Sequence, residues 1–347
     1  MATQKSVNPL VFFLHREERQ QITGVYARKT ATWDLETGQF LRYQIKQDMF
    51  SSDITSFEDD NPVFFKCVKE NEMAVWDIRA KRQISLFRGH NQWTQHYATS
   101  RDRSKIVGCH YCSSRTNIPR LIRVWDAQSG DMQYEFPWEG VGDPEGLYAC
   151  LTPDGQKLFC GSSILSGQAL IKGWDLNTGN ECFSVIPTKK QGSSPSHGVN
   201  FGYSFPHGVC ALKTNRDGRL LIAVLYDGIV KIWSTSSGAL LWEYSLFPTN
   251  SYKYLEKGAV LAVSPNDELL FCQFPNHQRS ECLVVEIETG RVLQRGLMHD
   301  EPVTQIDFSE DSKLIVTSTF RGFKPSLNQW DWQRSPYPKP LLLESPD

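Results

Sequence analysis

Residues 208–246 read GVCALKTNRDGRLLIAVLYDGIVKIWSTSSGALLWEYSL, and this stretch decides the fold. It contains four short apolar runs, at about Gly208–Thr214, Leu220–Leu225, Ile229–Trp233 and Leu240–Tyr244, separated by Asn, Asp, Gly and Ser. The runs are rich in strand-forming residues, and none carries a long apolar stripe with the 3.6-residue period of a helix. The stretch therefore predicts four short antiparallel strands joined by turns.

The same unit recurs along the whole chain. Its marker is a tryptophan, usually followed by aspartate, at Trp33, Trp76, Trp125, Trp174, Trp233 and Trp330. A glycine closes a turn five residues later at Gly38, Gly130, Gly179, Gly238 and Gly290, and Gly290 identifies Val285 as a seventh, Trp-less equivalent. The steps between these seven positions are 43, 49, 49, 59, 52 and 45 residues. A propeller blade needs roughly 40–45 residues, and loop insertions account for the excess.

A polar turn before each marker forms a second repeat in phase with the first. These turns are Arg16–Glu18, Asp59–Pro62, Arg101–Arg103, Pro153–Gly155, Arg216–Gly218, Pro265–Asp267 and Glu310–Ser312. Since a lone four-stranded sheet cannot bury both of its faces, stacked sheets are expected, with the tryptophans as wedges between them. The sequence thus predicts an all-β protein, a single seven-bladed β-propeller of four-stranded antiparallel blades.

The predicted domain spans residues 1–347. Its blades cover approximately residues 9–45, 54–88, 94–136, 146–186, 208–246, 258–296 and 302–344. Two alternatives remain for the outer strand of the last blade, which comes either from Pro340–Glu344 or from the N-terminal residues.

These markers resemble those of the WD-repeat (β-transducin-like) family over about residues 9 to 344. The family's Gly-His marker is intact at Gly89-His90, and its His, Asp and Trp positions are matched in the fifth unit by His207, Asp227 and Trp233. Ala223 stands where the family has a hydroxyl residue, so the repeats are degenerate. The resemblance implies a protein-interaction platform that is not an enzyme.

Composition narrows the class of protein. The net charge of −2 gives no general attraction to nucleic acid, so direct nucleic-acid binding is not indicated. No apolar run approaches the ~20 residues of a membrane helix, and the N-terminus lacks the apolar core of a signal peptide. Most of the nine cysteines lie in strand-like apolar runs, which is typical of buried thiols in a reducing compartment. A cytoplasmic or nuclear location is expected.

The long connections indicate where a protein or peptide partner binds. In this fold the second-to-third-strand and inter-blade connections lie on one face, and they hold the insertions at residues 111–120, 136–145, 162–168, 187–207, 247–257 and 275–280. Aromatic residues and arginine dominate binding hot spots. The predicted partner-binding residues are Trp93, Arg115, Trp138, Tyr203, Phe205, Tyr252, Tyr254 and Arg279. The alternative is that these rings only pin their own loops to the propeller.

No catalytic motif is recognisable, and neither a metal nor a cofactor is expected. The chain has no His-Glu-x-x-His, no Gly-x-Ser-x-Gly and no Gly-x-x-x-x-Gly-Lys. Cys109-His110-Tyr111-Cys112 lacks the second ligand pair of a structural zinc site. An enzyme on this fold stays an alternative, because the carboxylates of Asp53, Glu145, Asp300 and Glu301 precede first strands and could gather at the channel mouth.

One motif favours a particular partner. The segment 70–79, with Glu70, Met73, Val75 and Trp76-Asp77-Ile78-Arg79, resembles the Trp-Asp-x-Arg box of cullin-RING ubiquitin-ligase substrate receptors. The resemblance implies that Arg79 docks on the ligase adaptor, although Phe65 and Lys66 replace the small residues expected upstream. A substrate receptor is therefore an alternative function, and the sensor domain of a larger signalling protein is another.

Overall fold

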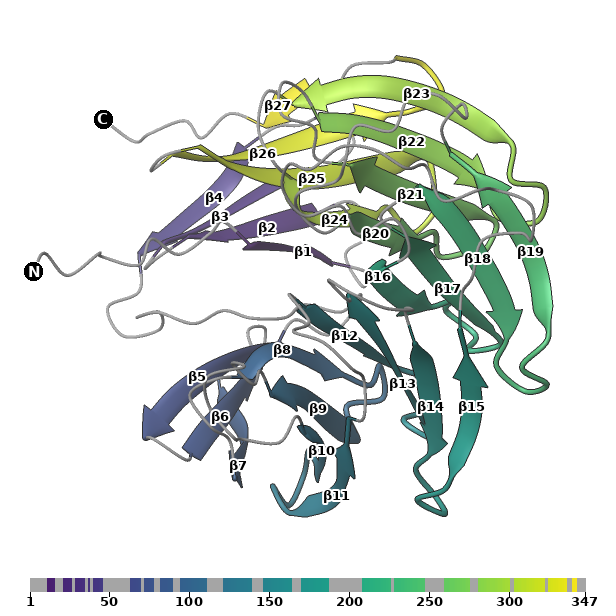
Figure 1. Cartoon of the computed structure of the whole chain (residues 1–347). Helices are drawn as coiled ribbons and strands as arrows, with labels where there is room; N and C mark the ends of the chain where they lie inside the picture. The colour runs from purple at the N-terminus through teal and green to yellow at the C-terminus, as the bar shows by residue number, and fades with distance from the viewer. Residues whose placement is uncertain are drawn as a thin grey trace, which may run out of the picture. The chain divides into compact units, whose positions relative to one another are not determined.

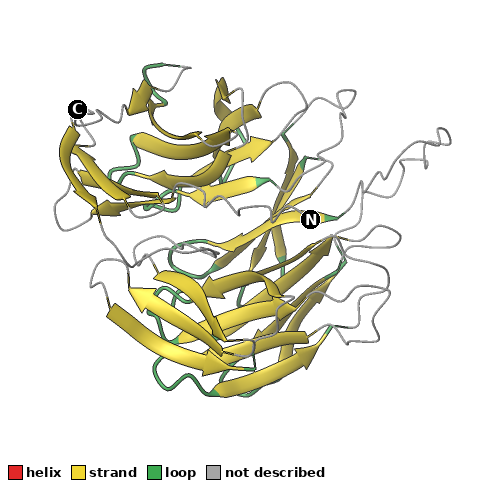
Figure 2. Ribbon diagram, turned by 90° about the vertical axis from the view of Figure 1, so that its left-hand side faces the viewer, coloured by secondary structure: helices red, strands yellow, loops and turns green. Residues whose placement is uncertain are grey.

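The computed structural model describes the strands and most of the short turns of the chain. The described residues are 11–15, 21–26, 29–34, 37, 40–45, 63–69, 72–77, 82–89, 94–110, 121–138, 146–163, 170–186, 208–225, 228–246, 259–274, 280–299, 303–321, 324–335 and 339–341. All regular elements in these residues are β-strands (Figure 1; Figure 2). Among them there is no helix long and apolar enough to cross a membrane. The prediction of an all-β fold is confirmed.

The chain divides into two compact units. The first unit comprises Met1–Cys67, Val75–Gln83 and Val260–Asp347, and the second comprises Val68–Ala74 and Ile84–Ala259. A three-stranded sheet has residues in both units and consists of β5 (Val63–Lys69), β6 (Glu72–Asp77) and β7 (Arg82–Arg88). The start of the blade predicted at 54–88, up to and including the turn at Asp59–Pro62, lies outside the described residues.

The second unit contains three four-stranded antiparallel sheets with their strands in chain order. The first sheet consists of β8 (Thr94–Thr99), β9 (Lys105–His110), β10 (Leu121–Asp126) and β11 (Met132–Pro137). The next consists of β12 (Gly146–Leu151), β13 (Lys157–Ser163), β14 (Ile171–Asp175) and β15 (Glu181–Val185). The third consists of β16 (Val209–Thr214), β17 (Leu220–Leu225), β18 (Ile229–Ser234) and β19 (Leu240–Ser245).

The first unit repeats this four-stranded arrangement three times. One sheet consists of β1 (Val11–His15), β2 (Gln21–Tyr26), β3 (Lys29–Asp34) and β4 (Phe40–Ile45). Another consists of β20 (Val260–Val263), β21 (Leu269–Phe274), β22 (Ser280–Glu286) and β23 (Val292–His299). The last consists of β24 (Val303–Phe308), β25 (Leu314–Arg321), β26 (Lys324–Asp331) and β27 (Lys339–Leu341).

Within each unit the sheets meet along their first strands. In the second unit β12 lies beside both β8 and β16, and in the first unit β24 lies beside both β20 and β1. The hydroxyl of Thr214 in β16 donates a hydrogen bond to the carbonyl of Leu151 in β12 at 2.9 Å. This packing of successive sheets agrees with the predicted blades, whereas a closed ring of seven stays a prediction.

The last sheet settles where its outer strand comes from. Lys339, Pro340 and Leu341 pair with Gln329, Asn328 and Leu327 of β26. The N-terminal strand β1 instead pairs with β2 in its own sheet. The alternative in which the N-terminal residues complete the last blade is therefore wrong, and the C-terminal alternative is confirmed.

The recurring Trp position acts as a wedge between sheets. Trp125 in β10 is fully buried, and its ring lies 4.7 Å from the ring of Phe87 in β7. Its indole N–H donates a hydrogen bond to the carbonyl of Arg88 at 2.7 Å, so the ring bridges two neighbouring sheets. Phe136 and Trp174 repeat this contact one sheet further on, with stacked rings 4.8 Å apart.

Candidate interaction surface

Most of the predicted partner-binding residues belong to the connections between strands that the structure does not describe. Trp93, Arg115, Tyr203, Phe205, Tyr252, Tyr254 and Arg279 lie outside the described residues. The same holds for the four carboxylates of the enzyme alternative, Asp53, Glu145, Asp300 and Glu301. Their roles stay predictions.

Trp138 is the one predicted binding residue that the structure describes. It follows the end of β11, and only 6% of its surface is exposed. Its ring lies 6.4 Å from that of Trp174, in an edge-to-face arrangement between the first two sheets of the second unit. This packing favours the alternative in which the ring pins its own connection, and contact of Trp138 with a partner stays a prediction.

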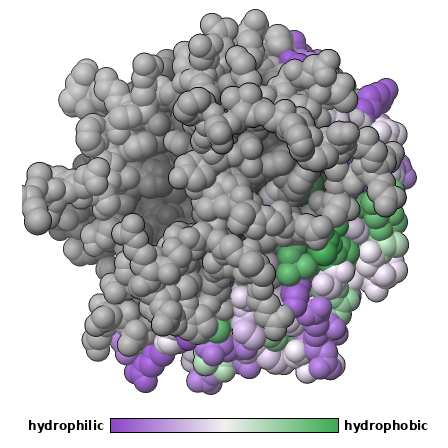
Figure 3. Space-filling view, in the orientation of Figure 1, coloured by the Kyte–Doolittle hydropathy of each residue, from purple (hydrophilic) through white to green (hydrophobic). Residues whose placement is uncertain are grey.

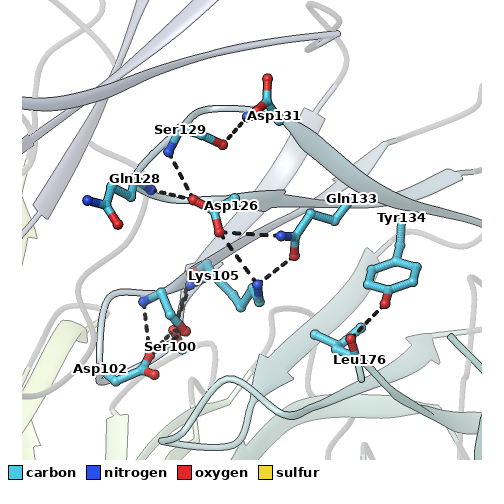
Figure 4. Close-up of polar contacts among 11 residues, drawn as sticks. Ser100, Asp102, Lys105, Asp126, Gln128, Ser129, Asp131, Gln133, Tyr134 and Leu176 are labelled. Carbon is cyan, nitrogen blue, oxygen red and sulfur yellow. Dashed lines mark hydrogen bonds and ion pairs between the residues drawn. The ribbon is translucent and has the colours of Figure 1, made fainter. Parts of the chain in front are cut away.

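The aspartate of the Trp-Asp pair builds a turn. One carboxylate oxygen of Asp126 accepts hydrogen bonds from the backbone N–H groups of Gln128 and Ser129, both at 2.9 Å (Figure 4). The other oxygen lies 3.7 Å from the ammonium group of Lys105 and accepts a bond from the amide of Gln133 at 3.3 Å. The backbone N–H of Ser129, followed by that of Gln128 and the charge of Lys105, lowers the pKa of Asp126 below its usual 3.8, against the opposing effect of burial. The polar groups of the motif thus stabilise the turn.

This network predicts a defined pH dependence for Asp126. Because the pKa is lower in the folded state, the charged carboxylate stabilises the fold above the unfolded pKa, and this stabilisation is lost as pH falls through the folded value. The amide introduced by Asp126→Asn keeps an acceptor oxygen but has no charge. We expect the difference in free energy of unfolding between wild type and Asp126→Asn to be constant near neutral pH and to shrink below the usual pKa of 3.8. Urea unfolding between pH 7 and pH 2 measures it, and a pH-independent difference would contradict this role.

Of the ligand residues in the cysteine motif, only Cys109 has a described side chain. Cys109 is buried at the end of β9, with its sulfur 3.9 Å from that of Cys160 in β13. Burial raises the pKa of Cys160 well above its usual range, so that thiol is protonated at neutral pH. No group of three or more His, Cys, Asp or Glu side chains in the described part could hold a metal ion. Cys112 and the side chain of His110 lie outside it.

The segment resembling the ligase-docking box is described only in part. Met73 and Val75 are buried in β6, in keeping with their apolar positions in the box. Glu70 and Arg79, which carry its charges, lie outside the described residues. The docking role of Arg79 therefore stays a prediction.

A row of ion pairs joins the third and fourth strands of each sheet in the second unit. Two residues before the Trp position, each third strand carries a cation, which pairs with a glutamate on the outer strand. The pairs are Arg123–Glu135 at 2.7 Å, Lys172–Glu181 at 3.0 Å and Lys231–Glu243 at 3.0 Å. Charges on these outer strands thus serve the sheets themselves.

Exposed apolar side chains lie at the outer strands. Among the described residues they are Leu41, Met132, Ile186, Leu240, Leu241 and Val292. Ile186, directly after β15, is 48% exposed. Figure 3 shows hydrophobic surface interrupting the mainly hydrophilic surface of the described part. Sequence reasoning did not single out these residues.

Comparison with known proteins agrees with the repeat pattern. The family described as WD domain, G-beta repeat, matches residues 200–234, which contain β16, β17 and β18. A curated relative is "Pre-mRNA-processing factor 19" from Schizosaccharomyces pombe, 22% identical over 283 residues. The match covers 79% of this chain but only 48% of the relative, so the chain spans about half the length of that protein.

Proposed function

We propose that this chain, which matches the WD-repeat family over residues 200–234, is a non-catalytic interaction scaffold, a subunit or adaptor of a multiprotein complex. WD repeats generally mediate contacts between proteins in complexes. In this proposal the face with the long connections binds a peptide or a folded partner. Long loops on a rigid scaffold are where binding usually takes place.

One observation carries the proposal: charged side chains at recurring positions of the second unit pair with groups of their own sheets. The carboxylate of Asp126 is used by its own turn and by Lys105, and the glutamates of the outer strands pair with cations of their own sheets. Such a framework is stable but offers little chemistry of its own, which favours recognition by the connections. The likeness to a pre-mRNA-processing factor supports a location in the nucleus, and a cytoplasmic location stays the alternative.

A co-purification experiment tests the loop face. We expect the double variant Trp93→Ala, Tyr252→Ala to lose at least one protein that wild type retains. Each substitution removes an aromatic side chain, and such a loss at a hot spot costs about 2 kcal/mol or more of binding free energy. The measurement is affinity purification followed by mass spectrometry. Gln128→Ala, an exposed residue of the turn after β10, is the matched control. Identical partner sets for all three proteins would refute the loop-face proposal.

A ubiquitin-ligase substrate receptor remains the second candidate function. It is favoured by the Trp76-Asp77-Ile78-Arg79 segment and by the burial of Met73 and Val75 beside it. If this role holds, wild type should co-purify a ligase adaptor and Arg79→Ala should lose it. The absence of any adaptor from the wild-type sample would rule out the receptor role.

A further inference from the structure

Among the described residues, β15 is the outer strand of its sheet and no strand pairs with its outer edge. The N–H of Ser162 in β13 bonds to the carbonyl of Leu170 at 3.2 Å, so Leu170 and Lys172 direct their backbone groups toward β13. Because antiparallel pairs alternate, Ile171 and Gly173 then bond to their partners Val185 and Phe183 in β15. The backbone N–H and C=O groups of Ser184 and Ile186 therefore point away from the sheet. Figure 1 shows β15 at the outer side of β14.

The equivalent outward position carries a charge in β11, β19 and β23, three outer strands whose pairing and side chains at this position are both described. It is Glu135 in β11, opposite Arg123, and Glu243 in β19, opposite Lys231. It is Arg295 in β23, opposite Leu283. In β15 it is Ser184, opposite Lys172. Charges at outward positions prevent another strand from adding to a sheet edge, so β15 lacks a protection that these three strands have.

The next outward position differs from that of β11 in the same sense, whereas β19 and β23 also have uncharged residues there, Ser245 and Leu297. In β11 it is Pro137, which has no N–H group to donate. After β15 it is Ile186, whose side chain is 48% exposed. The edge of β15 thus combines available backbone groups, a small exposed serine and an exposed apolar side chain.

The charges beside this edge indicate what it binds. In the neighbouring sheets the cation pairs with a glutamate directly across, whereas Lys172 pairs with Glu181 because Ser184 occupies that place. Strands in a sheet are about 4.8 Å apart, so a glutamate on an added strand opposite Ser184 could reach past the serine toward Lys172. An apolar residue two positions away would cover Ile186.

We propose that β15 binds an extended segment of a partner protein as a fifth strand, with an acidic residue opposite Ser184 and an apolar residue opposite Ile186. A second copy of this chain does not fit as well, because two rigid sheets meeting along a five-residue strand would bury far less than the roughly 1,200 Å² of a specific interface. A flexible segment can continue along the surface. The proposed site is the edge of β15 itself, whereas the proposed function uses the long connections, one of which begins directly after Ile186.

A synthetic peptide tests the proposal without knowledge of the partner. The probe is fluorescein-labelled Thr-Val-Thr-Glu-Thr-Val-Thr, which is symmetrical and so presents Glu between two Val residues in either strand direction. We expect saturable binding to the full chain by fluorescence anisotropy, and about tenfold weaker binding of the peptide with Lys in place of Glu. Binding should slow hydrogen exchange at the amide of Ser184, while the amides of Phe183 and Val185 are already protected.

Two substitutions at Ser184 separate edge pairing from loss of the fold. Ser184→Glu introduces the residue of β11 and β19 at this position, so the chain should keep its thermal stability and bind the Glu peptide at least about tenfold more weakly. Ser184→Thr should bind as wild type does. No saturable binding of the Glu peptide up to about 1 mM, or equal binding by Ser184→Glu, would overturn the proposal. Either outcome concerns only the edge of β15, so the co-purification experiment with Trp93→Ala, Tyr252→Ala would still test the proposed function.

Discussion

Trp125→Ala is expected to lower the free energy of unfolding by about 3–5 kcal/mol, the usual cost of removing a fully buried aromatic side chain. The ring of Trp125 fills the space between two sheets and lies against Phe87. The cavity that Trp125→Ala leaves cannot close easily, because Phe87 is itself buried and is in edge-to-face contact with the buried ring of Tyr97. Urea unfolding monitored by circular dichroism measures the effect.

Trp125→Phe is the matched control for this prediction. It keeps an aromatic ring but loses the N–H that binds the carbonyl of Arg88 at 2.7 Å. The expected loss is smaller than for alanine, since part of the ring contact remains and one hydrogen bond contributes about 1 kcal/mol. A loss below about 1 kcal/mol for Trp125→Ala would show that the ring is not a wedge.

Gly130→Ala is expected to cost about 3–4 kcal/mol, which is far more than the same change at Gly238. Both glycines close the turn after the Trp position in the left-handed region, at φ +79° and +70°. A Cβ atom at Gly130 would collide with the carbonyl oxygen of Leu86, part of the neighbouring backbone, and would lie 3.0 Å from its carbon. The backbone cannot move aside as a flexible side chain can.

Gly238→Ala separates this collision from the cost of the left-handed conformation. A Cβ atom there meets Phe183 at 3.6 Å, an ordinary contact, so only the conformational cost of about 1–2 kcal/mol is expected. The two variants, unfolded in urea under the same conditions, should differ by roughly 2 kcal/mol. Equal losses would mean that Leu86 yields to the added methyl group.

The strands were predictable because their signals are local. For the fifth unit the expected runs agree with β16, β17, β18 and β19 to within one residue at each end. Turn residues decide these ends, since left-handed glycines such as Gly218 and Gly238 stand where the chain reverses. The burial of Cys150, Cys160, Cys210, Cys272 and Cys282 was likewise predictable, because each lies in an apolar run.

The candidate surface was less accessible to sequence reasoning. Trp138 lies in a loop-like segment, where an aromatic residue is equally compatible with burial and with exposure, and its contact with Trp174 depends on a residue of the next sheet. The edge at Ser184 was overlooked for a related reason. A serine in a strand carries no signal alone, and its meaning comes from comparison with Glu135 and Glu243 at the same register position.

The residue pattern alone established the repeating four-strand unit, the tight turns between strands and the wedge position of the tryptophans. The strands and turns depend on neighbours within about ten residues, where side-chain alternation and turn chemistry act directly, whereas the wedge position was inferred from the recurrence of the tryptophans along the chain. Tertiary structure decided the rest: which carbonyl Trp125 binds, why Gly130 tolerates no side chain, and which residue stands opposite Lys172 at the edge of β15. Those outcomes depend on distances between residues far apart in the chain, which no local pattern specifies.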